Sequence, residues 1–163
     1  MTQSFSEKIK SKINEDLSPA RNLTGIHLKV VAAIAIIWSL FQLWYASPFP
    51  FLLNFGIFKG LPARAIHLGF ALCLAFLIYP ISKDKKISII DIIISFLGAF
   101  SCLYIYFFYD QLVDRGGVLL SININENLSL PIELIIGSCG ILILLEATRR
   151  AIGLPLVIIA ICF

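Results

Sequence analysis

Long apolar runs separated by short polar segments dominate this chain. Four runs have the length of membrane-spanning helices, and they cover approximately residues 28–46, 65–81, 87–109 and 130–145. A helix rises about 1.5 Å per residue, so about 20 apolar residues cross the hydrocarbon core of a bilayer. The pattern therefore predicts an all-α, polytopic bundle of four transmembrane helices.

The two ends of the chain differ from this four-helix region, which occupies residues 25–150. Residues 1–24 are polar, but four apolar residues recur at every fourth position, so the segment is either an interfacial amphipathic helix or a solvated cytoplasmic tail. Residues 151–163 are apolar but would form a helix only about 20 Å long, against about 30 Å of hydrocarbon. We expect them to be the truncated start of a fifth helix, and the chain to be a fragment.

Two segments between the runs are expected to lie outside the bilayer on one side. Residues 47–62 are apolar but contain Pro48, Pro50 and Pro62. They predict an interfacial loop or a short half-helix, because an interrupted backbone cannot face hydrocarbon. Residues 110–129 are predicted to form a polar loop.

Composition narrows the class of protein. Of the 163 residues, 59% are hydrophobic and 14% are charged, and the mean hydropathy is +0.93. Ordinary soluble domains have about 45–50% apolar and about 25% charged residues. A chain this short cannot bury so much apolar surface in a water-soluble core. Disorder is therefore excluded and a soluble enzyme disfavoured, while a net charge of +3 is too small to indicate nucleic-acid binding.

The distribution of positive charge predicts the orientation of the bundle. Of the thirteen Lys and Arg residues, only Lys59, Arg64 and Arg115 fall in segments that would be external if the N-terminus is cytoplasmic. The other ten fall in the internal segments. Cytoplasmic loops carry such an excess of Lys and Arg, so both ends of the four-span region are predicted to be inside.

Six charged residues at helix ends are candidate capping or docking positions. Three close the third span on the outer side, where they would cap the helix and pair with one another or offer charges to an external partner. The other three close the fourth span on the inner side, as a topological anchor or a docking joint, and include an acid and a base at the favourable i,i+4 spacing. The six are Asp110, Asp114, Arg115, Glu146, Arg149 and Arg150.

Three further ionisable residues lie near the ends of the spans. Asp91 is expected to be an interfacial carboxylate reaching Lys85 and Lys86, with a proton or cation ligand as the alternative. His67 is predicted to be a hydrogen-bonded interfacial histidine near the outer end of the second span. Glu133 is predicted at the outer edge of the fourth.

Catalytic chemistry has little support in the sequence. There is no nucleophile–base, phosphate-binding or zinc-binding motif, and we expect no enzymatic activity, metal or cofactor. Four cysteines stand singly in apolar runs, without the spacing of metal ligands. A thiol-redox membrane enzyme is therefore the weakest alternative; the cysteines are Cys73, Cys102, Cys139 and Cys162.

Three blocks of sequence resemble the N-terminal part of fused TRAP transporter permeases, in the group that works with TAXI-type solute-binding proteins. The blocks are LWYASPFPFLLNFGIFKGLPARAIHLGFALCLAFLIYP, YIYFFYDQLVDRGG and ILLEATRRAIGLPLVIIA. They occur in the family's order and cover about residues 41–161.

The resemblance implies a scaffold role in secondary active transport across a bacterial inner membrane. In this family a small membrane portion is joined to a large one, which holds the sites for the solute and the coupling ion, sodium. Those sites would lie outside this chain, so no substrate-binding residue is assigned here. The implied partners are the remainder of the large portion and a periplasmic solute-binding protein that delivers small organic acids or similar solutes. A stand-alone four-span accessory protein is the main alternative.

Overall fold

Helices form almost all of the protein in the computed structural model, which describes residues 20–162 except 22, 82–87, 117 and 126–127. The described part contains six helices and one two-stranded antiparallel hairpin, so the predicted all-α class is confirmed. The predicted tail or amphipathic helix lies mostly outside the described residues. The elements are α2 (Gly25–Ala46), α3 (Phe49–Leu52), α4 (Gly60–Ile78), α5 (Ile89–Asp114), β1 (Ser121–Asn125), β2 (Leu128–Pro131), α6 (Ile132–Ala151) and α7 (Leu154–Cys162).

Three helices, α2, α4 and α5, are long and apolar enough to cross a membrane. They coincide with the first three predicted spans and make the chain a candidate multi-pass membrane protein. The fourth predicted run lies within α6, a helix of 20 residues. This helix is not one of the three, because charged residues occur near both of its ends; these are Glu133, Glu146, Arg149 and Arg150.

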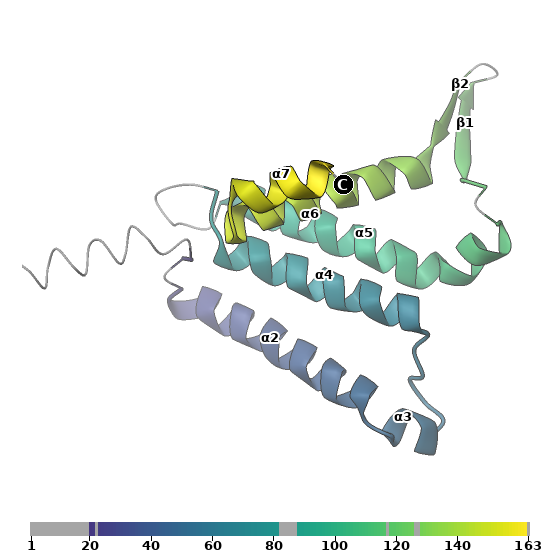
Figure 1. Ribbon diagram of the computed structural model, residues 1–163. Coiled ribbons are helices and arrows are strands. Elements are labelled where there is room, and N and C mark those ends of the chain that lie inside the picture. The colour runs from purple at the N-terminus through teal and green to yellow at the C-terminus, as the bar shows by residue number, and fades with distance from the viewer. Residues whose placement is uncertain (1–19, 22, 82–87, 117, 126–127, 163) are drawn as a thin grey trace, which may run out of the picture.

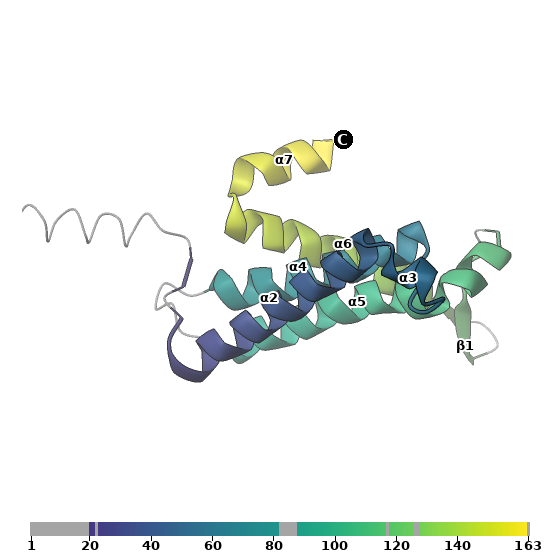
Figure 2. The same cartoon turned by 90° about the horizontal axis from the view of Figure 1, so that it is seen from below.

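The long helices α2, α4, α5 and α6 lie side by side, and each runs opposite to the one before it (Figure 1). Helix α7 turns back along α6 (Figure 2). The bundle consequently has two distinct ends. We call the end with the start of α5 and the finish of α6 the charged end. The opposite end, with α3 and the β-hairpin, is the hairpin end.

Local chemistry determines where these helices begin and end. Helix α2 stops before Pro48, where the Ser47 hydroxyl donates to the Trp44 carbonyl oxygen at 2.8 Å. Helix α5 begins with a capping box, in which the Ser88 side chain accepts from a backbone amide and the Asp91 carboxylate accepts from the Ser88 amide. Gly153 turns the chain into α7 with φ of +110°, a conformation that favours glycine.

The core lies where α4, α5 and α6 meet, and small residues allow these helices to approach closely. A Cβ atom on Gly98 would stand 3.0 Å from Cγ2 of Ile143, and one on Gly140 would stand 3.3 Å from Cβ of Ser101. Small residues at helix interfaces are typical of membrane bundles, where close van der Waals packing drives association. The buried hydrophobic cluster here is Leu72, Phe76, Cys102, Ile143 and Ala147.

The outer faces of the helices are strongly apolar. Along α2 only Val31 is buried, whereas Ile36, Leu40 and Leu43 are each about 60% exposed or more. A continuous apolar surface of this kind is unfavourable in water. It fits contact with lipid or with another membrane segment.

The two predicted outer segments fold differently from each other. Residues 47–62 form a loop around the four-residue α3, as expected, and α4 begins within them at Gly60. The polar loop predicted for residues 110–129 is wrong in part, because α5 continues to Asp114 and a hairpin follows it. The register of this hairpin pairs Ser121 with Pro131, next to the start of α6.

Candidate functional site

A buried carboxylate, that of Asp91, connects three parts of the chain at the charged end. Its Oδ2 accepts from Nη2 of Arg21 at 2.7 Å, and its Oδ1 accepts from Nη1 of Arg150 at 2.7 Å. The Asp91 side chain is fully buried, and both arginine side chains are at most 3% exposed. Charges removed from water in this way require partners, and here each carboxylate oxygen has an arginine.

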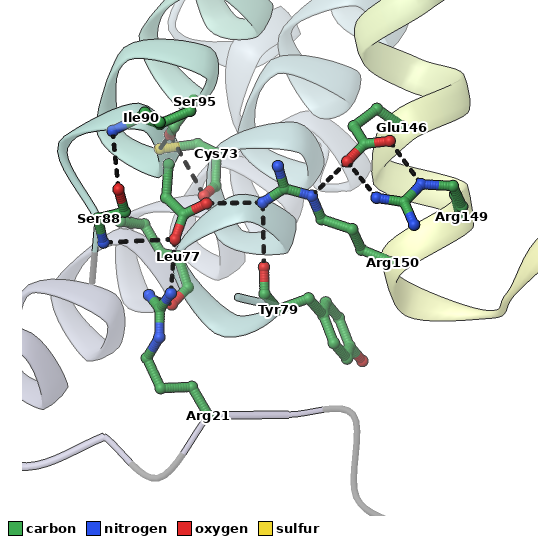
Figure 3. Close-up of polar contacts among 11 residues, drawn as sticks. Arg21, Cys73, Leu77, Tyr79, Ser88, Ile90, Ser95, Glu146, Arg149 and Arg150 are labelled. Atoms are coloured by element: carbon green, nitrogen blue, oxygen red, sulfur yellow. Dashed lines mark hydrogen bonds and ion pairs between the residues drawn. The ribbon is translucent and has the colours of Figure 1, made fainter. Parts of the chain in front are cut away.

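Arg21 ties the segment before α2 to the end of α4. Its Nη1 donates to the carbonyl oxygen of Leu77 at 2.8 Å (Figure 3). Its backbone amide donates to the carbonyl oxygen of Ile78 at 2.8 Å. The last carbonyls of a helix have no partner within the helix and carry its partial negative charge. An arginine at this place therefore closes α4 and neutralises Asp91 with one side chain.

Arg150 performs the corresponding role from α6. Beyond Asp91, its Nη1 lies 3.4 Å from the Tyr79 carbonyl oxygen, and its guanidinium carbon lies 4.9 Å from the centroid of the Phe76 ring. Its Nε donates to Oε1 of Glu146 at 2.8 Å, which confirms the predicted i,i+4 pair. Glu146 also accepts two hydrogen bonds from Arg149, both at 2.7 Å.

This charged network corrects the prediction for Asp91. We expected the carboxylate at the interface, reaching Lys85 and Lys86, which lie outside the described residues. It is instead buried and held by arginines 70 and 59 residues away in the chain. With both oxygens bound by guanidinium groups, Asp91 is suited to joining helices, and the described contacts do not favour the alternative of a proton or cation ligand.

A second buried carboxylate, Glu133, organises the hairpin end. It accepts from the Tyr104 hydroxyl at 3.1 Å, from Nη2 of Arg115 at 2.6 Å and from the Leu120 amide at 2.9 Å. These contacts join the last turns of α5, the entry to β1 and the first turn of α6. Glu133 was predicted at the outer edge of the fourth run and does lie in the first turn of α6, but its buried role was not anticipated.

The predicted pairing among Asp110, Asp114 and Arg115 is wrong. Asp110 forms an ion pair with Lys59, the residue that immediately precedes α4. This contact raises the pKa of the Lys59 ammonium group. Arg115 bonds Glu133 and also donates through Nε to the carbonyl oxygen of Gln111 at 3.0 Å. Asp110 and Arg115 therefore connect α5 to neighbouring elements, and the described ion pairs join none of the three residues to another.

His67 is hydrogen-bonded, as predicted, and lies within an aromatic cluster between α2 and α4. Nε1 of Trp38 donates to its Nδ1 at 3.0 Å, and the amide nitrogen of Gln42 is 3.4 Å from the same atom. The ring centroid of Phe41 is 5.1 Å from that of the histidine. These contacts assign His67 a packing role.

The cysteines and other potential ligands do not converge on a metal or redox site in the described part of the chain. All four cysteines are free thiols there. The Ser95 hydroxyl donates to Sγ of Cys73 at 3.2 Å, which accounts for one of them. No group of three or more His, Cys, Asp or Glu side chains with metal-binding geometry is found among these residues.

Comparison with known proteins adds no relative: no protein-family model, curated protein or solved structure matches the chain. The chemistry of the site therefore rests on its own geometry. Ion pairs at both ends of the bundle, together with a close-packed middle, can hold helices in a fixed arrangement.

Proposed function

We propose that this chain is the membrane scaffold portion of a TRAP-type secondary active transporter. It would hold the small-subunit-like helices of a permease whose large portion carries the sites for solute and coupling ion. The resemblance of the three sequence blocks supports this family. The three membrane-length helices and their exposed apolar faces support a role inside a larger membrane assembly.

One observation carries the scaffold role: the charged side chains that the structure describes gather at the two ends of the bundle. The charged end has Arg21, Asp91 and Arg150, and the hairpin end has Arg115 and Glu133. A transport path needs polar or ionisable groups near the membrane midplane. The middle of this bundle is instead filled by apolar and small residues, as in a support.

The proposed topology has four spans, with α6 as the fourth and the N-terminus in the cytoplasm. Helix α6 runs antiparallel to α5 between the same two ends, and its four charged residues lie in its first turn and its last two turns. The charged end would face the cytoplasm, with Arg149 at the level of the lipid headgroups. The hairpin would then face the periplasm, where a solute-binding protein could reach it. The compartment is the bacterial inner membrane.

Uptake assays test this proposal. In the source strain, deleting the coding region for this chain should abolish sodium-dependent uptake of one or more organic acids, and restoring it should recover uptake. The chain purified alone in proteoliposomes should transport none of these solutes. Transport by the chain alone, or unchanged uptake of every tested acid after deletion, would overturn the scaffold role; the second result would favour a stand-alone accessory protein.

A further inference from the structure

The hairpin end contains a hollow of about 540 Å³ between the segment before α4 and the last turns of α5. Its volume falls within the range of about 300–1,000 Å³ that is typical of small-molecule sites. Five aromatic rings line it, and the rings of Phe58 and Tyr106 stand 6.0 Å apart, centroid to centroid. The five are Phe55, Phe58, Tyr106, Phe107 and Tyr109.

One cation and one anion stand together at this hollow. Lys59 and Asp110 form an ion pair, and Nζ of Lys59 is 5.3 Å from the centroid of the Tyr109 ring. Both charged side chains are exposed, at 62% and 74%. A ligand with one positive and one negative group can therefore contact both Asp110 and Lys59, and neither side chain has to be buried without an opposite charge.

The position of the hollow indicates where such a ligand comes from. It lies where two membrane-length helices end, which is the level of the lipid headgroups when these helices cross a bilayer. Phe55 and Phe107 are each more than 70% exposed and would be unfavourable in water. They offer an apolar surface to the glycerol backbone and first methylene groups of a lipid.

We propose that this hollow binds the headgroup of a zwitterionic phospholipid, phosphatidylethanolamine. The phosphate accepts hydrogen bonds from Lys59, and the primary ammonium group contacts Asp110 and the ring face of Tyr109. An anionic headgroup without an ammonium group would leave Asp110 facing negative charge. Phosphatidylcholine cannot donate a hydrogen bond to the carboxylate, because its ammonium group is fully methylated.

The test is native mass spectrometry of the full chain after exchange from nanodiscs that contain equal amounts of phosphatidylethanolamine, phosphatidylcholine and phosphatidylglycerol. We expect phosphatidylethanolamine to be retained at least threefold over each of the others. Soluble phosphoethanolamine, added in millimolar excess, tests whether the headgroup alone binds. If the acyl chains contribute to binding, it will displace only a small part of the bound phosphatidylethanolamine. Equal retention of the three lipids would overturn the proposal.

Substitutions test the two charges separately. Lys59→Ala and Asp110→Asn should each reduce the preference for phosphatidylethanolamine to near unity, and Asp110→Lys should shift it toward phosphatidylglycerol. Arg64→Ala is the matched control, because Arg64 is an exposed cation in the first turns of α4 that does not line the hollow. Unchanged preference in all three variants would exclude this site.

Folding is monitored in the same samples by thermal unfolding. Since Lys59 and Asp110 are exposed, we expect all variants to unfold as the parent chain does, so a lost preference reports on the site. The inference requires that the helices cross a bilayer, but it does not require a transport role. The uptake assay can therefore fail while the lipid preference is observed, and the lipid preference can be absent while the uptake assay succeeds.

Discussion

Two buried carboxylates, those of Asp91 and Glu133, hold separate elements of this molecule together. Asp91 and Glu133 are both acidic residues near the start of a helix, and both bond groups from other elements. Asp91 pairs with Arg21 and Arg150, which are distant in the sequence. Glu133 pairs with Arg115, on the other side of the hairpin in the sequence. Because unpaired charges are costly inside a membrane protein, these contacts are expected to contribute strongly to stability.

Replacing Asp91 with asparagine should destabilise the bundle by about 3–5 kcal/mol, because Arg21 and Arg150 would remain buried without their shared carboxylate. The measurement is thermal or denaturant unfolding in detergent. Asp114→Asn is the matched control, since Asp114 is exposed and its change should stay within about 0.5 kcal/mol. Equal stability of the two variants would show that the buried network contributes little.

A mutant cycle separates the two arginines. In the background of Arg150→Met, the further loss caused by Asp91→Asn should be smaller than in the parent chain, because part of the interaction is already gone. Strictly additive losses would mean that Asp91 and Arg150 do not cooperate despite their 2.7 Å contact.

Contacts within one helix can be predicted from the sequence more easily than contacts between distant segments. The pair Glu146–Arg150 could be predicted because it lies within one helix, at a fixed spacing. The partners of Asp91 could not be predicted, because Arg21 and Arg150 become neighbours only when α4, α5 and α6 pack together. Proximity in sequence favoured Lys85 and Lys86, whereas the described structure has both carboxylate oxygens bonded by distant arginines.

At the scale of elements, helices were predicted well and the hairpin was missed. Apolar runs longer than about 17 residues have few alternatives to a helix in a membrane, so α2, α4 and α5 were found. The segment Ser121–Asn125 alternates polar residues with isoleucine, which is the period of a strand. The surrounding asparagines and the short length favoured a loop, although the alternation was available as a signal.

Glycine positions in the helices should differ sharply in their tolerance. Gly98→Leu should destabilise the bundle by about 1–3 kcal/mol or more, because even a Cβ atom there stands 3.0 Å from Ile143. Gly137→Leu should be neutral or stabilising, since nothing lies within 4 Å of its Cβ position. Unfolding of the two variants in the same detergent decides this, and similar losses would contradict the packing of α5 on α6.

Glu133 bonds the backbone at the entry to the hairpin, through the Leu120 amide. Glu133→Gln should accelerate amide hydrogen exchange in β1 and β2, because the neutral side chain holds Arg115 and the Leu120 amide less strongly. Tyr104→Phe removes one neutral contact to the same carboxylate and should have a smaller effect. If exchange in the hairpin is unchanged by Glu133→Gln, the strands are held by other contacts.

At the scale of the whole molecule, the antiparallel order of the helices leads to a prediction of sidedness. In a cysteine-free background, Gly116→Cys should react with an impermeant thiol reagent from outside intact cells. Lys85→Cys should react only in inverted vesicles, because an odd number of spans separates the two positions. Reaction of both positions from one side would contradict the proposed topology.

The shared carboxylate of Asp91 also has a consequence for biogenesis. During synthesis, Arg21, α4 and the start of α5 leave the ribosome well before Arg150, which follows Asp91 by 59 residues. Until that arginine arrives, Oδ1 of the buried Asp91 carboxylate lacks its guanidinium partner. A chain stalled before residue 150 should therefore be recognised by quality-control proteases more readily than one stalled just after it.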